Sequence, residues 1–490
     1  MAILATGAIV KDIVAVLFAF AIIYFAVVKN LFRALEIYFI WFFIYNYFTG
    51  QGFIQNEIIS KFLTKPSFLI TIVFFFYMNK IPGKLFSRNF IMIWLIFLIL
   101  TILSSLVHNQ SPFVIFTLSA FFITFLILQA RGLTFAHHKR LLNLFVAVAL
   151  VQTMISFMQV TQFIAPPSKM MDDGSGNQFE WVAGLDDVAS GTFGPVASHL
   201  AGWYAALISV ILVLVWSVEK KGKYILIACC SFLQFATADS KIIMGVTILM
   251  IVTLLFYLFR NRTLFKIKSR RYITLLAIVF VGSLSFYIAW DTYYEYYGEK
   301  TGGSRVSLKS VYKNEAQFSS DLILENLTDW GKIRGFQYVF KDFIDSDISL
   351  LFWGYGVNGY NFNGKMGYIE QKGPPIMQLN NFTNSRSGLI KQFAVSGLLG
   401  ILLFLISIFL WARFNNQKVR NKYDLIKNSL LKIYLPFTFI AAFLYSIELS
   451  SIPVIAFSAI ISIYLKMSEF DRQEQIMFKN NAIQKSLSHG

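Results

Sequence analysis

The sequence predicts an all-α polytopic membrane protein with about 13 transmembrane helices (about 12–14) and a large external loop between helices 10 and 11. Composition is the first support, because 56% of the 490 residues are hydrophobic and only 14% are charged, whereas soluble chains carry roughly 25% charged residues. Apolar runs long enough to cross a bilayer recur along the chain. A polar stretch, residues 291–390, separates two groups of these runs.

The apolar runs indicate helices rather than barrel strands. Lipid offers no hydrogen-bonding partner to the backbone, so a long continuous run must satisfy its own backbone groups as a helix. The third run is the weakest, since its apolar centre covers only Phe68–Met78. The predicted spans are 8–28, 35–54, 66–81, 89–107, 112–130, 140–164, 196–217, 223–238, 241–259, 272–290, 390–412, 430–448 and 453–467.

The positive charge follows the pattern of a membrane protein rather than that of a nucleic-acid-binding protein. The net charge is +17, and most of the 43 lysines and arginines fall in alternate connections when the N-terminus is placed outside. Cytoplasmic connections carry such an excess. This orientation places residues 291–390 outside and the C-terminus in the cytoplasm. The excess positive charge therefore reflects topology and does not indicate a nucleic-acid partner. The short external connections hold only Lys61, Lys65, Lys169 and Lys241.

This topology divides the chain into four parts. Residues 1–290 contain transmembrane helices 1–10, residues 291–390 form the partly helical external loop, residues 391–467 contain helices 11–13, and residues 468–490 form a cytoplasmic tail. Functional residues are often carried on loops that a rigid scaffold positions. The loop between helices 10 and 11 is therefore the first place to look for recognition or chemistry.

Two shorter external segments carry candidate acid–base groups. Segment 165–195 is acidic and contains Asp187, and His199 follows just inside the next span. Acidic loops are usually solvated and ionisable groups within spans are often functional, so structural and catalytic interpretations both stay open. Asp239 and Lys241 lie in the next external turn. There, a helix cap and a lysine reaching the headgroups are favoured over an anion site at the helix N-terminus.

The large loop holds a helix, a glycine turn and two cations at its end. Apolar residues at helical spacing in 333–344 predict an amphipathic helix with Arg334 on its other side. Gly354–Tyr360 is a turn that matches no nucleotide-binding fingerprint. Arg386 precedes helix 11 and Lys391 lies five residues deeper. These two cations repel each other unless an anion lies between them, and the arginine fork suits phosphate.

Four patches, in chain order, resemble the O-antigen polymerase and O-antigen ligase superfamily, which includes the Wzy-like polymerases of bacterial polysaccharide assembly. The likeness covers roughly residues 185–412, and the order and topology of the patches carry more weight than any single motif. In the second patch Lys241 stands where the family has arginine, and in the fourth Arg386 and Gly397 are separated by ten residues. The patches are Gly191-Thr-Phe-Gly194, Ala238-Asp-Ser-Lys241, Arg334–Phe340 with Leu351–Tyr360, and Asn384–Gly400.

The resemblance implies a GT-C-like glycosyltransferase architecture in the bacterial inner (cytoplasmic) membrane. The implied substrate is an undecaprenyl-pyrophosphate-linked oligosaccharide, and a polymerase would transfer the growing glycan to a second lipid-linked repeat at the outer face. Because pyrophosphate-lipid is a good leaving group, no metal or nucleotide cofactor is expected. Membrane lipids and a chain-length regulator protein are the other partners that the resemblance admits.

The resemblance also suggests roles for individual residues. The expected pyrophosphate-binding cations are Arg386, Arg334, Lys241 and Lys391, of which the two arginines are also expected to be catalytic, because cations in a water-poor site stabilise charge on the leaving group. A base would accept the proton of the acceptor hydroxyl. The candidate bases are His199, Asp187 and Asp239, and the candidate glycan contacts are Tyr355, Tyr360 and Asn384.

Two other functions remain as alternatives. An O-antigen ligase would transfer finished glycan to lipid A core, but ligases typically present a histidine where Asn384–Arg386 stand, and residues 291–390 contain no histidine. A flippase or transporter for lipid-linked oligosaccharides would suit many spans and basic cavity residues. Transporters commonly show internal repeats and broken spans, and the sequence shows neither clearly. Polymerase is therefore the favoured interpretation.

Overall fold

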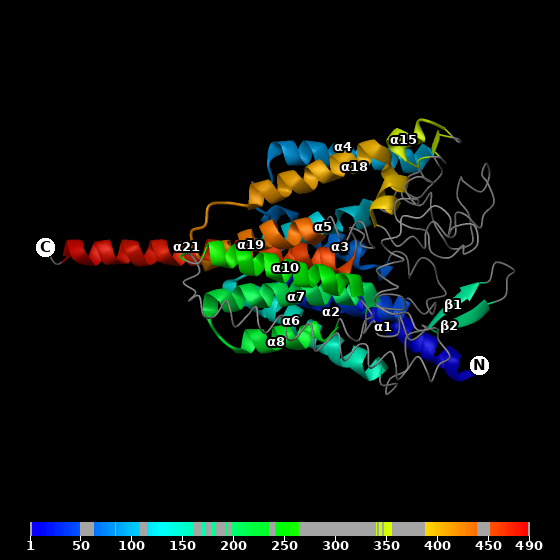
Figure 1. The fold of residues 1–490 in the computed structure, drawn as a ribbon, viewed down its shortest axis with the longest axis horizontal. Helices are drawn as coiled ribbons and strands as arrows, with labels where there is room; N and C mark the ends of the chain where they lie inside the picture. Colours follow the sequence, from blue (N-terminus) through cyan, green and yellow to red (C-terminus); the bar gives the residue numbers. More distant parts are fainter. Residues whose placement is uncertain are drawn as a thin grey trace.

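A computed structural model gives the fold of the chain (Figure 1). The structure describes residues 2–49, 63–83, 85–107, 115–160, 168–172, 178–182, 193, 198–234, 241–261, 263, 340, 343–344, 347–354, 388–438 and 451–488.

Most of the described residues lie in α-helices that run side by side along one bundle (Figure 1). The helices are α1 (Ala2–Val27), α2 (Leu31–Thr49), α3 (Pro66–Tyr77), α4 (Arg88–Val107), α5 (Ile115–Ile127), α6 (Phe135–Val160), α7 (Ser198–Glu219), α8 (Lys223–Phe232), α10 (Lys241–Arg260), α15 (Leu350–Trp353), α18 (Gly388–Asn415), α19 (Lys422–Phe437) and α21 (Ile452–Ser488), with a short 3₁₀ turn η2 (Met78–Lys80).

Five of the described helices are long and apolar enough to cross a membrane, which supports the predicted membrane protein. They cover Arg88–Val107, Phe135–Gln159, Leu200–Glu219, Val395–Asn415 and Ile452–Phe478. Every predicted span except 272–290, which lies outside the described residues, coincides with at least part of a helix. The total of about 13 spans stays a prediction.

The outer helices present apolar side chains to the surroundings. Along α4, Met92, Leu95, Ile99 and Leu103 are each about half exposed. An exposed apolar surface of this extent marks a membrane or protein contact. In contrast, α7 and α21 are buried over most of their apolar lengths. The bundle therefore has a buried centre and an apolar outer surface, as expected of a protein embedded in lipid.

One β-hairpin accompanies the helices. Strands β1 (Ser168–Asp172) and β2 (Gln178–Val182) pair antiparallel, with Met170 opposite Glu180. The hairpin lies within the acidic segment 165–195 between α6 and α7. The predicted all-α class thus describes the bundle, while this connecting segment adds two short strands that hydropathy does not reveal.

Helix α19 begins earlier than the predicted span at 430–448. It starts at Lys422, so Asp424 and Lys427 lie inside the helix and are almost fully buried. Hydropathy excludes such residues from a span because unpaired charges are costly in an apolar environment. Here the two charges pair with each other, so the helix enters the bundle earlier than the hydropathy pattern predicts.

Helix α21 extends beyond the bundle. It continues through the predicted tail 468–490 as far as Ser488, and in Figure 1 this red helix projects past the ends of its neighbours. The last described residues therefore continue the final span as a helix.

The basic connections meet at one end of the bundle. Arg140 Nε lies 2.7 Å from Glu36 Oε1, which ties the start of α6 to the start of α2. The backbone N–H of Arg131 donates to the carbonyl of Lys80 at 2.8 Å, which joins the α5–α6 and α3–α4 connections. Cations concentrated at one end match the asymmetry that orients membrane proteins.

This asymmetry predicts opposite labelling of two engineered cysteines. In a background with Cys229→Ala and Cys230→Ala, we expect Ser307→Cys, in the large loop, to react with a membrane-impermeant maleimide in intact cells. Lys418→Cys, exposed at the basic end, should react only after the membrane is permeabilised, because the excess of cations predicts that this end faces the cytoplasm. Labelling of Lys418→Cys in intact cells would reverse the proposed orientation.

Candidate functional site

Helix α18 is broken at Gly397. This residue has φ 62° and ψ −170°, which is not helical, so α18 consists of two helical segments. Almost only glycine adopts this conformation. A break leaves backbone N–H and C=O groups without their intrahelical partners, and in apolar surroundings other protein groups must approach them. Gly397 is near the start of the apolar stretch Val395–Asn415, so the break lies at the end of the span that leads into the large loop.

A second glycine packs directly against this break. Gly354 ends α15 with φ 70° and ψ −175°. A Cβ atom at Gly354 would lie 2.5 Å from the backbone nitrogen of Ser396, and one at Gly397 would lie 2.7 Å from the backbone nitrogen of Trp353. No larger residue fits at either position without displacing backbone. The two backbones are in direct contact, and we call this contact, formed by Gly354 and Gly397, the glycine junction.

Helix α4 and neighbouring side chains hold the glycine junction in place. Ser104 Oγ donates to the carbonyl of Gly354 at 2.9 Å, and the N–H of Gly354 donates to the carbonyl of Leu350 at 2.7 Å. In the first segment of α18, Gln392 Nε2 donates to Ser396 Oγ at 3.0 Å. The junction is thus built from three parts of the chain that are far apart in sequence.

The glycine junction joins two of the patches identified in the sequence. Gly354 belongs to the turn Gly354–Tyr360, and Gly397 belongs to the re-entry segment that begins with Asn384. Arg386 stands two residues before α18, and Lys391 lies in its first segment. One described residue of the predicted turn, Gly354, therefore meets one of the re-entry segment, Gly397, at the end of the bundle opposite the basic connections (Figure 1).

The other predicted site residues are placed only in part. Lys241 is the first residue of α10 and His199 is the second residue of α7, as their positions before or inside these spans predict. The side chains of Lys241, His199 and Lys391 are not described, so their distances to the glycine junction stay untested. Predicted site residues outside the described part of the chain are Asp187, Asp239, Arg334, Tyr355, Tyr360, Asn384 and Arg386.

One residue of the Gly191-Thr-Phe-Gly patch has a structural role. Phe193 is fully buried, and its ring lies 5.5 Å from that of Tyr204 on α7 and 6.3 Å from that of Phe43 on α2. Tyr204 in turn donates its hydroxyl to the carbonyl of Phe145 at 2.6 Å. Phe193 therefore anchors the chain before α7 in the core. The described ranges contain no cluster of three or more His, Cys, Asp or Glu side chains suited to a metal ion.

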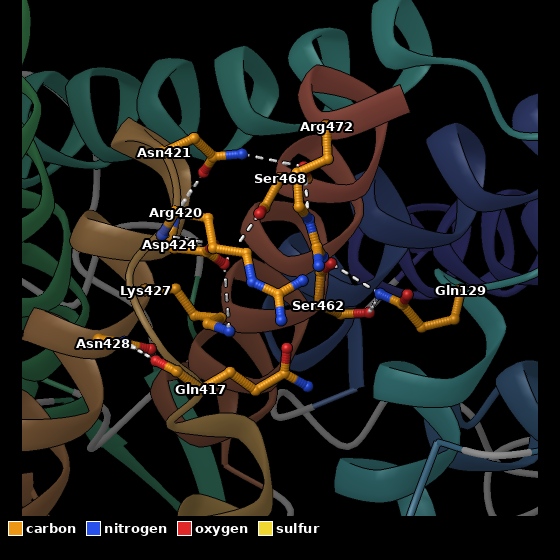
Figure 2. A network of polar contacts seen from close by, with 10 residues as sticks. All are labelled: Gln129, Gln417, Arg420, Asn421, Asp424, Lys427, Asn428, Ser462, Ser468 and Arg472. Atoms are coloured by element: carbon orange, nitrogen blue, oxygen red, sulfur yellow. Dashed lines mark hydrogen bonds and ion pairs between the residues drawn. The ribbon is translucent and has the colours of Figure 1, made fainter. Parts of the chain in front are cut away.

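A buried polar network between α19 and α21 was missed by the sequence analysis (Figure 2). Asn421 caps α19 by accepting from the N–H of Asp424 at 2.9 Å. Asp424 accepts from Ser468 Oγ at 2.8 Å and lies 3.6 Å from Lys427 Nζ. Asn421 also donates to the carbonyl of Ser468 at 3.0 Å. Asparagine followed three residues later by a carboxylate is a helix-start signal, and it would have placed the start of α19 at Lys422.

Helix α21 is also tied to α5 by a row of hydrogen bonds. Ser458 Oγ donates to the carbonyl of Phe121, and Ser462 Oγ donates to that of Phe125, both at 2.6 Å. Gln129 Nε2 donates to the carbonyl of Ser462 at 2.7 Å (Figure 2). The spacing of four residues on both helices keeps the partners on facing sides. Small hydroxyl residues thus let the two helices pack closely, as in other membrane bundles.

The chain was compared with protein-family models and with curated proteins, and none of them matches it. The choice among functions therefore depends on the glycine junction and on the residues that carry the resemblance.

The glycine junction predicts that neither glycine tolerates a side chain. Gly354→Ala and Gly397→Ala should each destabilise the protein by more than the roughly 1–3 kcal/mol that a non-glycine residue costs in such a backbone conformation, because the added Cβ also meets backbone. Thermal unfolding of the detergent-purified protein measures this. Gly83→Ala is the control, since a Cβ there meets nothing within 4 Å. Equal melting temperatures for all three variants would show that the two backbones do not touch.

The Asp424–Lys427 pair predicts strong coupling. Lys427→Met should leave a buried carboxylate without its cation, and Asp424→Ala a buried ammonium without its anion. Each change is expected to cost roughly 3–5 kcal/mol. The double variant should lose much less free energy of unfolding than the two single variants lose together, because no lone charge remains. The free energies of unfolding of the wild type, the two single variants and the double variant, measured in one detergent, give the double-mutant cycle. Additive losses of stability would contradict a direct contact between the two charges.

Proposed function

We propose that the protein is a polysaccharide polymerase for O-antigen, capsule or exopolysaccharide. It transfers a growing glycan from undecaprenyl pyrophosphate to a lipid-linked oligosaccharide repeat at the outer face of the bacterial cytoplasmic membrane. The observation that carries the proposal is the glycine junction. Gly354 and Gly397 belong to two of the patches whose sequences resemble those of the polymerases. Their backbones are in direct contact at the end of the bundle opposite the basic connections.

The first segment of α18 suits an anionic leaving group. The free N–H groups at a helix start favour anions, and Arg386 stands two residues before Gly388, the first residue of α18. The broken helix turns this segment away from the axis of the rest of α18 (Figure 1). Arg386, together with Arg334 and Lys391, would therefore bind the pyrophosphate where the chain enters the membrane.

The transfer is a substitution at the anomeric carbon. The acceptor hydroxyl oxygen forms a bond to this carbon, the bond from the carbon to the pyrophosphate oxygen breaks, and the electron pair stays on the pyrophosphate. The hydroxyl proton passes to a base, for which His199, Asp187 and Asp239 are the candidates. Cations that stabilise the new charge on the pyrophosphate lower the barrier, and the step consumes no nucleotide.

The broken α18 is also the feature that most favours transport. Transporters place substrate sites at interrupted helices near the middle of the membrane. Gly397, however, is only the third residue of the 21-residue apolar stretch Val395–Asn415. The break therefore lies near a membrane surface, where it serves a site for two lipid-linked substrates better than a path across the bilayer. A flippase for lipid-linked oligosaccharides stays the second candidate.

Chain extension by the purified protein tests the proposal. Liposomes containing the protein receive an undecaprenyl-pyrophosphate-linked repeat without metal or nucleotide, and the products are separated by size. A ladder of repeats is expected. Arg386→Ala and Arg334→Ala should each slow it about a hundredfold or more, because each removes one positioned cation. Arg413→Ala is the matched control, since Arg413 lies exposed at the other end of α18.

The alternatives give different results in the same liposomes. Normal ladders from both arginine variants would contradict the site, even if the polymerase activity stands. Movement of the lipid-linked sugar across the bilayer without a ladder would identify a flippase. Product formed only when lipid A core is supplied as the acceptor would identify a ligase.

A further inference from the structure

A cavity of about 790 Å³ opens at the basic end of the bundle. It lies among α6, α7, α8, α19 and α21, at the end of the bundle that is remote from the glycine junction (Figure 1). Sites for small ligands commonly have volumes of roughly 300–1,000 Å³. Its lining includes four lysines, Lys139, Lys221, Lys223 and Lys422.

Exposed cations surround the mouth of the cavity. Its four lysines face a single carboxylate, that of Glu219. Glu219 Oε2 already lies 3.4 Å from Lys221 Nζ and accepts from the Tyr224 hydroxyl at 2.9 Å. Lys139, Lys223 and Lys422 are exposed and add positive charge to the lining. Such a mouth attracts anions.

The ammonium groups of two of these lysines lie over aromatic rings. Lys223 Nζ is 5.3 Å from the centre of the Tyr224 ring, and Lys422 Nζ is 4.9 Å from that of Tyr423. Both rings also line the cavity. Cation–π contacts at such distances are attractive, so they favour side-chain positions beside the mouth over positions turned into solvent.

Aliphatic side chains form much of the cavity wall, to which Tyr464 adds a buried hydroxyl. Leu142, Ile211, Val215 and Ile426 contribute aliphatic surface. Tyr464, on the central helix α21, is 1% exposed, and its hydroxyl makes no hydrogen bond within the described part of the chain. A buried hydroxyl without a partner is unfavourable, and a ligand oxygen in the cavity would satisfy it. This observation is independent of the lysines and points into the same cavity.

We propose that this cavity binds the phosphate headgroup of an anionic phospholipid from the cytoplasmic leaflet. Basic pockets between membrane helices recognise such headgroups. The lysines pair with the phosphate, the aliphatic wall contacts the upper part of an acyl chain, and Tyr464 donates its hydroxyl to a phosphate or ester oxygen. The network of Asp424, Lys427 and Ser468 holds together α19 and α21, which form one wall of this site. The proposal does not depend on the polymerase activity.

Native mass spectrometry of the full-length protein tests the lipid site. The delipidated protein is titrated with phosphatidylglycerol and, separately, with phosphatidylcholine. We expect one tightly bound phosphatidylglycerol and no comparable phosphatidylcholine. Lys223→Gln combined with Lys422→Gln should weaken phosphatidylglycerol roughly thirtyfold, since each cation near a membrane surface contributes about fivefold. Tyr464→Phe should weaken it several-fold through the lost hydrogen bond.

A charge-matched control separates the cavity from general attraction. Arg131 and Lys418 are exposed cations that do not line the cavity, so Arg131→Gln combined with Lys418→Gln should keep the affinity of the wild type. Equal weakening by both double variants would overturn the proposal, as would equal binding of the two lipids. Competition by millimolar glycerol phosphate would retain the phosphate site but assign it to a soluble phosphate instead of a lipid.

Discussion

Polar groups placed among apolar helices are stabilised by partners within the protein, and this constraint shapes much of the bundle. Unpaired backbone or side-chain groups cost several kcal/mol in a lipid environment (roughly the cost of a lost hydrogen bond without water). Hydroxyl groups inside the helices therefore donate to carbonyls of the same helix, as Thr101 Oγ1 does to Phe97 at 2.8 Å. The same need pairs Asp424 with Lys427 and ties α21 to α5 through Ser458 and Ser462. A continuous helix meets this requirement for the backbone, because its N–H and C=O groups bond to each other.

At Gly397 helix α18 is interrupted, so backbone groups there lose their partners within the helix. The structure compensates by laying the end of α15 against the exposed backbone and by adding a hydrogen bond from Ser104 to Gly354. Strained backbone in a packed structure often accompanies function, because the surroundings must be arranged to maintain it. The break lies near the start of the apolar stretch Val395–Asn415, which follows the large loop in the sequence, and this is the reason why the candidate site is placed at this end.

The sequence predicts where most of the described helices lie along the chain, but it does not predict how these helices contact each other. Apolar runs predict α4 and α7 closely, since hydropathy and length alone decide a span. The start of α19 was misplaced because hydropathy treats Asp424 and Lys427 singly, whereas their cost depends on their pairing. The cavity at the basic end was not predictable, because it forms where α6, α7 and α8 meet α19 and α21, two groups of helices that are distant in sequence. The order of the four patches along the chain indicated the resemblance, but only the packing of Gly354 on Gly397 brings two of these patches together.

The continuity of α21 has a practical consequence. Helix α21 runs from Ile452 to Ser488, roughly 55 Å at 1.5 Å per residue, and its first half is fixed in the centre of the bundle. A soluble carrier domain whose first helix continues α21 in phase would inherit a fixed orientation relative to the membrane part. Such a rigid fusion would supply the asymmetric mass outside the detergent micelle that particle alignment in electron cryomicroscopy requires.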